Sequence, residues 1–459
     1  MDFTGKKVVI MGLGINKEGS GVSSALFFAR AGAQVLVTDY KPRSFFTAQI
    51  KKLTPHKNIR FVFGRHNESD FKNADIIIKN PDVPKSSPYL AVARTHGIPV
   101  HNDWSVFLSL HDNPLVGVTG TRGKSTTTTL IHEMLRNTYS VKLCGNIGVS
   151  PLAIAGKTRP EDVLVAELSS WNLQQFDVVK KSPHIAVVTN LLPDHLNKYK
   201  NIREYYRDKE NIFRYQTNRD ALVANRDNKE VVKRVKKAKA HILWFSHKPF
   251  KGDGAYVKNG KIMFSFDGRT EQVCSVKEIR IPGAHNLENV LAAVCVAAIA
   301  GISPKEIKRT ITRFRGIPNR LELVRETKGV QYYNDTTATS PDAVIAALRA
   351  LDSKKVVLLA GGTDKKLDYS LFAKEIRKYK PRLILFAGTA TDKIRKELKK
   401  YPRILGEVRS MKEAMRLAKA HAKKGDIVLL SPGAASFGIF KNEFDRGAQF
   451  YRQVKTMHS

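Results

Sequence analysis

The sequence predicts an α/β protein of three domains, because three segments of the chain each open with the signal of a buried strand. Short apolar runs at residues 7–11, 115–119 and 355–360 are each followed by a glycine-containing turn and a helical pattern. Strands that alternate with helices in this way form parallel sheets covered by helices. A length of 459 residues leaves room for about three domains of ordinary size.

The composition excludes several other classes of protein. Hydrophobic residues make up 42% of the chain and charged residues 26%, which is enough apolar material for a sizeable core. Three scattered cysteines are too few for a disulfide framework or a cysteine-rich zinc site. The N-terminus lacks a signal peptide, and the longest apolar run, residues 290–300, is too short to cross a bilayer. We therefore expect a cytoplasmic protein without membrane insertion.

The charge balance is strongly basic. The chain has 78 lysines and arginines against 42 acidic residues, which gives a formal net charge of +36. Such a charge is compatible with nucleic-acid or anionic-membrane binding, or with a lysine-rich surface that steers polyanionic small substrates. The basic residues are spread over the whole chain, and the densest run, residues 229–239, has the spacing of a solvated helix face. We therefore expect no nucleic-acid partner.

The first segment, residues 1–111, is predicted to be a Rossmann-like domain. A strand at 7–11 precedes Gly12-Leu13-Gly14, a helix at about 21–31 and a strand at 34–38 that ends at Asp39, and a further strand covers 74–79. The third glycine of a dinucleotide fingerprint would fall at Lys17, so NAD is not demanded. The pattern indicates a nucleotide-containing ligand, with Leu13, Gly14 and Asp39 as candidate contacts.

The second segment, residues 112–316, carries a phosphate loop between the strand at 115–119 and a helix that begins at about Ser125. Glycines allow successive N–H groups to face phosphate oxygens, a lysine can reach the β- and γ-phosphates, and a serine hydroxyl can ligate Mg²⁺. The strict pattern has glycine where this chain has Val118. The sequence predicts a P-loop ATPase-like parallel sheet whose ATP-binding residues are Gly120, Thr121, Gly123, Lys124, Ser125 and Thr126.

Three further residues in this segment are candidates for the same site. Glu167 ends the strand predicted at 163–166, where a carboxylate that holds a metal ion belongs. His195 follows the strand predicted at 184–189 and could bind a metal or position a substrate. Lys209 lies in a charged helical stretch, and its surroundings alone favour a solvated lysine.

The third segment, residues 317–459, is again predicted to be Rossmann-like. Strands are expected at 355–360, 383–387 and 427–430, each followed by a helical pattern. The segment boundaries fall at Asp112-Asn113-Pro114 and Gly316-Ile317-Pro318, which carry turn signals.

The order of motifs resembles the Mur ligases, the ATP-dependent amino-acid ligases of peptidoglycan precursor synthesis. The resemblance covers essentially the whole chain, and together its motifs are highly specific. The residues that carry it are 120–125, 145–148, 167–170, 190–195, 283–289, 430–436 and 440–442. Residues 167–170 and the two C-terminal motifs are most similar to the branch of the family that adds D-glutamate to UDP-N-acetylmuramoyl-L-alanine.

The resemblance implies a role for each matching residue. Two Mg²⁺ ions would be held by Ser125, Glu167, His195 and Lys209, the last of which matches a carbamylated lysine. In ATP, Asn286 and Asn289 would contact the adenine, Asp335 would bind the ribose, and Arg320 would reach the phosphates. Asp39 would contact the uridine, and Asn146 and Ser169 the muramoyl substrate. The glutamate carboxylates would be held by Thr339, Lys365 and Ser436.

Two positions depart from the family pattern near the expected amino-acid pocket. Thr337 replaces a lysine, and the C-terminal motif reads Phe440-Lys441-Asn442-Glu443-Phe444-Asp445-Arg446-Gly447, with a glutamate ahead of the phenylalanine. L-glutamate or another amino acid therefore stays an alternative acceptor.

The implied reaction is an attack of the alanine carboxylate on the γ-phosphate of ATP, which gives an acyl phosphate that the amine of glutamate then attacks. Lys124, His195, Lys209 and Arg320 would be the catalytic residues, and we expect a monomer. A nucleic-acid-dependent ATPase, a nicotinamide dehydrogenase and a folylpolyglutamate- or cyanophycin-type ligase are the alternatives. No RNA-binding signature favours the first, and the dehydrogenase leaves the loop at Lys124 unexplained.

Overall fold

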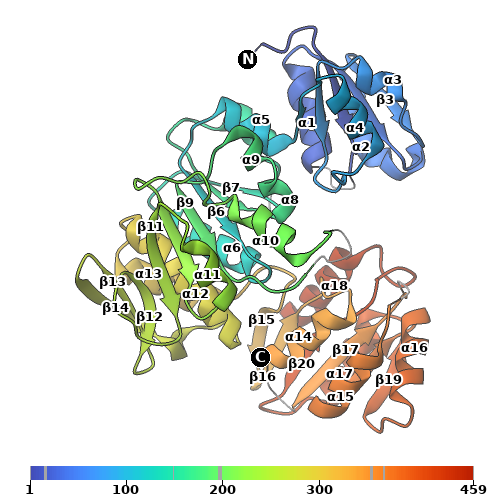
Figure 1. Ribbon diagram of the computed structural model, residues 1–459. Helices are drawn as coiled ribbons and strands as arrows, with labels where there is room; N and C mark the ends of the chain where they lie inside the picture. The colour runs from blue at the N-terminus through green and yellow to red at the C-terminus, as the bar shows by residue number, and fades with distance from the viewer. Residues whose placement is uncertain are drawn as a thin grey trace. The chain divides into compact units, whose positions relative to one another are not determined.

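Apolar runs of four to six residues form the central strands of three separate sheets in the computed structural model, which describes residues 2–14, 18–147, 149–194, 199–351, 355–364 and 367–457. The chain divides into two compact units, the first made of residues 1–276 and 288–310 and the second of residues 277–287 and 311–459. The first unit contains two of the sheets and the second unit contains one (Figure 1).

The N-terminal sheet is entirely parallel, in the order β3-β2-β1-β4-β5. Its strands are β1 (Lys7–Met11), β2 (Gln34–Asp39), β3 (Ile59–Phe63), β4 (Ile76–Lys79) and β5 (Val100–His101). Its connecting helices are α1 (Ser20–Arg30), α2 (Thr47–Leu53), α3 (Glu68–Lys72) and α4 (Pro88–Thr95), with the short 3₁₀ helix η1 (Arg43–Phe46). Strand β1 lies between β2 and β4, so the loop after β1 opens where the strand order reverses.

The central sheet has the order β14-β13-β12-β11-β10-β9-β6-β8-β7. Its parallel strands are β6 (Leu115–Thr119), β7 (Val141–Gly145), β8 (Val163–Glu167), β9 (Ile185–Val188), β10 (Ala221–Asn225), β11 (His241–Ser246) and β12 (Gly254–Lys258). The strands β13 (Lys261–Phe266) and β14 (Arg269–Ser275) extend it as an antiparallel edge. Strand β6 lies between β8 and β9, so this sheet also has a reversal point, at the end of β6.

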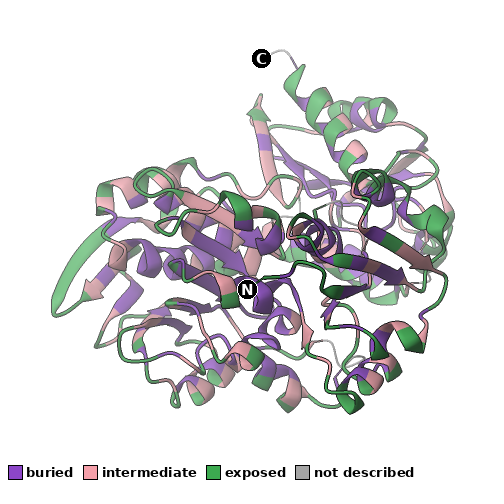
Figure 2. Ribbon diagram, turned by 90° about the horizontal axis from the view of Figure 1, so that it is seen from above, coloured by how far each residue is buried: buried purple, intermediate pink, exposed green. Residues whose placement is uncertain are grey.

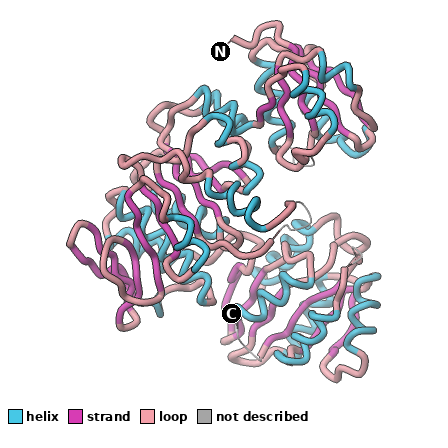
Figure 3. Tube along the Cα trace, viewed as in Figure 1, coloured by secondary structure: helices cyan, strands magenta, loops and turns pink. Residues whose placement is uncertain are grey.

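Helices cover the central sheet, as the tube trace shows (Figure 3). They are α6 (Lys124–Leu135), α7 (Pro151–Ile154), α8 (Ser170–Leu173), α9 (Phe176–Val179), α10 (Ile202–Glu210), α11 (Lys229–Val235), α12 (Ala284–Ile299) and α13 (Pro304–Arg313), with η2 (Ala155–Lys157) and η3 (Val276–Glu278). Among the described residues, no helix is long and apolar enough to span a bilayer.

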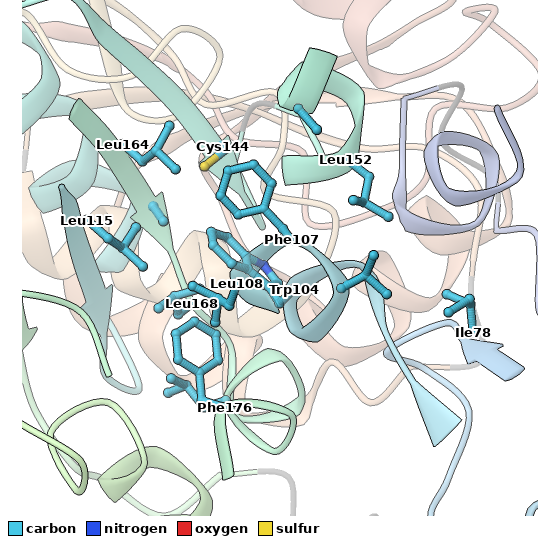
Figure 4. Close-up of a cluster of buried hydrophobic side chains, with 14 of the residues drawn as sticks. Ile78, Trp104, Phe107, Leu108, Leu115, Cys144, Leu152, Leu164, Leu168 and Phe176 are labelled. Atoms are coloured by element: carbon cyan, nitrogen blue, oxygen red, sulfur yellow. The ribbon is translucent and has the colours of Figure 1, made fainter. Parts of the chain in front are cut away.

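Helix α5 (Asp103–Leu110) connects the first two sheets and packs against α7 and α9. Its apolar side chains enter the core beside the central sheet, where Trp104 and Phe176 have ring centroids 5.6 Å apart. Figure 4 shows Trp104, Phe107 and Leu108 together with Leu164 and Leu168 from the region of β8. The strand end that carries Glu167 is therefore built on a continuous hydrophobic core.

The C-terminal sheet has the order β15-β16-β20-β17-β18-β19, parallel except for the antiparallel edge pair β15–β16. Its strands are β15 (Glu322–Thr327), β16 (Val330–Asn334), β17 (Val356–Gly361), β18 (Arg382–Phe386), β19 (Ile404–Val408) and β20 (Ile427–Leu430). Its helices are α14 (Pro341–Leu351), α15 (Ser370–Tyr379), α16 (Thr389–Leu398), α17 (Met411–His421) and α18 (Glu443–Lys455). Strand β20 lies between β16 and β17 and ends at the reversal point.

The predicted architecture of three α/β domains is confirmed, and most predicted strands agree with the structure to within two residues. Buried residues concentrate along the strands, and exposed residues on the outer faces of the helices (Figure 2). The antiparallel edges β13–β14 and β15–β16 were not predicted, because their polar residues give no continuous apolar run. The domain boundaries at residues 111 and 316 stay a prediction.

Candidate active site

The loop after β6 has the backbone shape that the phosphate-loop motif predicts. Gly120 has φ +149°, and a Cβ there would lie 1.9 Å from the Thr189 hydroxyl oxygen. Gly123 has φ +80°, and a Cβ there would lie 2.2 Å from the side-chain oxygen of Asn289. Both the backbone conformation and the space exclude larger side chains, so the two glycines are required by the loop itself.

The segment after β9 holds this loop in place. The Thr121 amide donates to the Asn190 carbonyl at 2.9 Å, and the Arg122 amide donates to the Asn190 side-chain oxygen at 2.9 Å. The Thr189 hydroxyl donates to the Arg122 carbonyl at 2.7 Å. Asn190 is thus a supporting residue that the sequence did not single out, although an amide side chain directly after a buried strand could have indicated it.

The first turn of α6 begins directly after Gly123 and presents Lys124, Ser125 and Thr126. The Lys124 ammonium donates to the carbonyls of Gly120 and Thr121 at 3.1 and 3.2 Å, so it lies over the loop. The amide groups of a first helical turn have no acceptor within their helix, and the helix dipole makes this end positive. An anion such as a phosphate group is stabilised at this position.

Glu167 lies at the end of β8, beside the start of α6, and is almost fully buried. The Ser125 hydroxyl donates to one Glu167 oxygen at 2.6 Å, and the Asn146 side-chain amide donates to the other at 3.0 Å. The structure therefore brings together three of the predicted residues, one from each of three neighbouring segments.

Lys209 of α10 is buried, with 3% of its surface exposed, and lies beneath the phosphate loop. Its ammonium donates to the Gly120 carbonyl at 2.9 Å and lies 4.9 Å from the centre of the Tyr205 ring. Burial, together with the nearby Lys124 ammonium, holds the pKa of the Lys209 amine well below its ordinary value. The interpretation of Lys209 as a solvated lysine, which its neighbours in the sequence favoured, is wrong.

These side chains suit a hard divalent cation. Hydroxyl and carboxylate oxygens, as in Ser125 and Glu167, are the ligands that Mg²⁺ prefers. Within the described part of the chain, no three His, Cys, Asp or Glu side chains gather closely enough to hold a metal ion without other ligands. His195, the predicted histidine ligand, lies outside the described residues.

The two asparagines predicted to contact adenine lie in different compact units, Asn289 in the first and Asn286 in the second. The Asn289 side-chain oxygen accepts a hydrogen bond from the Thr127 hydroxyl at 3.2 Å, which places Asn289 against the start of α6. The Asn286 side chain donates to the Pro282 carbonyl at 2.6 Å.

The loop after β1 is organised around Asp39, which ends the neighbouring strand β2. One Asp39 oxygen accepts the Leu13 amide at 2.9 Å and the other accepts the Lys41 amide at 3.0 Å. Gly14 follows with φ +73°. The exposed ring of Tyr40 lies beside Asp39 and packs on His66, at 4.2 Å between ring centroids. Tyr40 and His66 were not predicted, and nothing in their spacing in the sequence pointed to them.

Ser169 begins α8 as its N-cap residue. Its hydroxyl accepts the Asn172 amide at 3.2 Å and donates to the Asn172 side-chain oxygen at 2.6 Å. Ser169, which lies two residues after Glu167, therefore caps helix α8 in this structure.

In the second unit, Asp335 follows β16 and is buried. Its carboxylate accepts the Leu321 amide at 3.0 Å and the Ser431 hydroxyl at 2.7 Å. Burial raises the pKa of Asp335 to about 7, although both hydrogen bonds favour the ionised form. Arg320, next to Leu321, is exposed.

The residues predicted to hold the amino acid lie on neighbouring loops of this unit. Thr339 follows β16, and Ser436, which is almost fully buried, follows β20. Gly433 of the second loop donates its amide to the Ala338 carbonyl of the first at 2.8 Å. Lys365 lies outside the described residues. The two residues that depart from the family pattern both form hydrogen bonds within this unit. The Thr337 hydroxyl donates to the Asn319 carbonyl at 2.9 Å, and the Glu443 backbone carbonyl accepts from the Thr336 hydroxyl at 2.8 Å.

The three sheets and the loop after β6 define a class of protein, a multidomain α/β enzyme that binds a nucleoside triphosphate. Comparison with known families narrows the class. Residues 6–102 match the family described as "Mur ligase MurD-like, N-terminal domain", residues 118–297 the "Mur ligase middle domain" and residues 319–433 the "Mur ligase, glutamate ligase domain".

Relatives match over the full length. The chain is 37% identical to the UDP-N-acetylmuramoylalanine--D-glutamate ligase of Roseiflexus sp. (strain RS-1), across 99% of this chain and 100% of the relative. It is 35% identical to the enzyme of the same name from Koribacter versatilis, across 100% and 99%. The chain belongs to the Mur ligase family, whose members are ATP-dependent ligases that form amide bonds.

Solved structures show the same fold. The chain is similar to the UDP-N-acetylmuramate-alanine ligase MurC of Thermotoga maritima, with a TM-score of 0.58, 19% identity and coverage of 98% of this chain and 99% of the other. It is also similar to MurF of Acinetobacter baumannii, with a TM-score of 0.59, 13% identity and coverage of 98% and 93%.

Proposed function

We propose that this chain adds D-glutamate to the alanine carboxylate of UDP-N-acetylmuramoyl-L-alanine, with conversion of ATP to ADP and phosphate. The observation that carries the proposal is the full-length similarity to enzymes named for this reaction. The contact of Ser125 with Glu167 beside the phosphate loop also supports the proposal, because these oxygens suit a Mg²⁺ ion. The alanine carboxylate can be phosphorylated only where the negative charge of the triphosphate is offset.

The loop after β6 binds the triphosphate. Its backbone and the first turn of α6 supply donors for the phosphate oxygens, and the Lys124 ammonium offsets their charge. Arg320 adds a second positive charge when the C-terminal domain contributes to the site. The ATP-binding residues are Gly120, Thr121, Gly123, Lys124, Ser125, Thr126, Asn286, Asn289, Arg320 and Asp335.

Two Mg²⁺ ions would neutralise the phosphate oxygens and draw the attacking carboxylate toward the γ-phosphate. Ser125 and Glu167 would hold one ion, and His195 and Lys209 would hold the other. Carbamylation would turn Lys209 into an oxygen ligand. This modification requires the neutral amine of Lys209. Burial supplies this state, because it holds the pKa of Lys209 well below its ordinary value.

The remaining residues bind the two other substrates. The UDP-linked substrate contacts Leu13, Gly14, Asp39, Asn146, Ser169 and His195, and glutamate is held by Thr339, Lys365 and Ser436. The domains are residues 1–111 for the UDP substrate, 112–316 for ATP and 317–459 for the amino acid and ATP. The protein works as a monomer in the cytoplasm, without a nucleic-acid partner.

The test is an assay of phosphate release from ATP with UDP-N-acetylmuramoyl-L-alanine and either D- or L-glutamate. We expect release that requires both acceptors and is much faster with D-glutamate. Faster turnover with L-glutamate would show that the differences at Thr337 and Glu443 change the stereochemistry of the acceptor. ATP hydrolysis without acceptors, stimulated by DNA or RNA, would contradict the proposal.

A further inference from the structure

Arg446 of α18 is a charged residue that none of the proposed roles includes. Its side chain is one of the largest that the protein buries completely, with 1% of its surface exposed. Burial of a guanidinium costs several kcal/mol unless other groups replace its hydration, so such a residue usually has a specific purpose.

The guanidinium joins the two loops that carry Thr339 and Ser436. Its Nε donates to the Thr336 hydroxyl at 3.0 Å and its Nη2 to the Thr336 carbonyl at 2.9 Å, both in the loop after β16. Its Nη1 faces the Ala434 carbonyl of the loop after β20 at 3.4 Å. One side chain therefore fixes the separation between two loops of the expected amino-acid pocket.

A third segment is attached to the same loops. Thr363, which lies two residues before Lys365, pairs with Ala435 through two backbone hydrogen bonds, each of 3.0 Å. Arg446 contributes to the wall of a narrow crevice at this junction, together with Gly361, Gly362 and Ser436. All three segments expected to contact the amino acid thus meet beside Arg446.

The acceptors of Arg446 are all neutral. They are one hydroxyl and two carbonyl groups, and among the described residues no ion pair joins Arg446 to a carboxylate. Glu443, three residues earlier on α18, acts on Arg446 only through its field. The buried positive charge is therefore solvated by dipoles without being neutralised, and its field favours an anion bound at the neighbouring loop that carries Ser436.

We propose that Arg446 is a positioning residue that sets the spacing of the amino-acid pocket and makes the pocket prefer an acidic amino acid to its amide. This inference rests on the proposed function, since it assigns the two loops that Arg446 joins to the amino-acid substrate. A residue that serves only as a structural brace would affect folding without changing the discrimination between glutamate and glutamine.

The experiment compares Arg446→Gln and Arg446→Lys in the full-length enzyme. Phosphate release is measured with D-glutamate, D-glutamine and D-aspartate, and the KM for ATP serves as internal control. We expect Arg446→Gln to raise the KM for D-glutamate at least about 10-fold, to lower the preference for glutamate over glutamine by a similar factor and to change the KM for ATP less than about 2-fold. Arg446→Lys keeps the charge but cannot bridge both loops, so its KM for glutamate rises while its preference for the acid persists.

An unchanged preference for glutamate in Arg446→Gln would overturn the inference while leaving the proposed function intact. Wild-type turnover with D-aspartate in place of glutamate, lost in Arg446→Gln, would overturn the proposed function and support the inference. Wild-type preference for a neutral amino acid would overturn both.

A second pair of variants covers the case in which the Arg446 variants do not fold. Thr336→Val removes the hydroxyl that accepts from Nε, and Thr336→Ser retains it. We expect the KM for glutamate to rise in the valine variant and to recover in the serine variant. Equal KM values for the two variants would show that the contact has no effect on the amino acid.

Discussion

The loops after β1 and β6 occupy the same place in two parallel sheets, yet they are built differently. Each follows a strand that lies between two parallel neighbours, and each leads into a helix. In the first loop, the Asp39 carboxylate accepts the Leu13 amide. In the second loop, the amides of Thr121 and Arg122 are held by Asn190, a neutral residue, and the helix then begins with Lys124 and Ser125.

The difference shows that the strand order determines where a ligand can bind but does not determine the charge of the ligand. A carboxylate ends the neighbouring strand at both loops, Asp39 of β2 at the first and Glu167 of β8 at the second. The helix after the second loop, however, begins with Lys124, whereas α1 begins with Ser20. Since both helices direct their positive ends toward their loops, the side chains of the loop and first turn decide which site accepts a triphosphate.

The largest effect is expected from Lys124→Ala, which removes the cation that distinguishes the second loop. Turnover should fall by roughly 10³-fold or more, because the phosphate loop loses a positive charge that would offset the charge of the triphosphate in the transition state. Phosphate release and circular dichroism measure the loss and the retained fold. Wild-type turnover in this variant would contradict the claim that Lys124 distinguishes the second loop as the triphosphate site.

Lys209→Ala should be the next most damaging, with a loss of about 10²-fold. The buried amine contacts the Gly120 carbonyl beneath the phosphate loop, whereas the loop after β1 has no proposed counterpart. An added short carboxylate should partly restore activity if a carbamate oxygen is what the site has lost. The matched control is Arg207→Ala, an exposed residue of the same helix, and equal losses in both variants would contradict the assignment.

Ser125→Ala and Ser20→Ala compare the first turns of the two helices directly. Ser125 donates to Glu167 at 2.6 Å, so its loss should raise the Mg²⁺ concentration needed for half-maximal activity on the order of 10- to 100-fold. Ser20 begins α1 and should affect the requirement for Mg²⁺ hardly at all. A Mg²⁺ titration of phosphate release measures both. An equal shift for the two variants would show that the effect is general and not located at the phosphate loop.

Much of the contrast between the loops after β1 and β6 could be predicted from the sequence, because apolar runs show where buried strands end. Buried strands bounded by glycine or proline placed Lys124, Ser125 and Glu167 at one edge of a sheet, and the structure brings the last two into contact. The resemblance to a known family then supplied roles that spacing alone could not.

The burial of Lys209 and Arg446 could not be predicted from the sequence pattern, although the family resemblance included Lys209 and the motif that contains Arg446. Both lie on helices that contain many charged residues, and their burial comes from packing against loops that are distant in sequence. Helical periodicity identifies a polar face but does not show which charged residue a neighbouring segment covers. The antiparallel strands β13 and β14 were missed because they lack a continuous buried run: β13 alternates between more buried and more exposed residues, and the first four residues of β14 are polar and exposed.

Asp39→Asn should have a smaller effect, confined to the first loop. Asparagine has one acceptor oxygen, so one of the two backbone amides held by Asp39 loses its acceptor and the other keeps a neutral one. The KM for UDP-N-acetylmuramoyl-L-alanine should rise about 10-fold, which corresponds to one weakened hydrogen bond to a charged group. The KM for ATP should stay constant. A change in the KM for ATP as large as that for the UDP substrate would mean that the two loops do not act separately.

Asp335 extends the comparison to the second unit, because it also accepts the amide of a leucine, Leu321, but is fully buried. Its pKa of about 7 lies above that of an unfolded aspartate, so folding favours the protonated form. This contribution to stability is fully present below about pH 4 and is lost as the pH rises toward 7. Relative to Asp335→Asn, the wild-type protein should therefore lose about 1 kcal/mol of unfolding free energy per pH unit in that range.

Urea denaturation of both proteins at pH 5, 6 and 7 measures this difference. Asparagine can retain both hydrogen bonds, since its oxygen accepts the Leu321 amide and its amide donates to Ser431, so the variant isolates the effect of the charge. A constant difference across the range would show that Asp335 is already ionised at pH 5. In that case the two hydrogen bonds that Asp335 accepts would outweigh the effect of its burial.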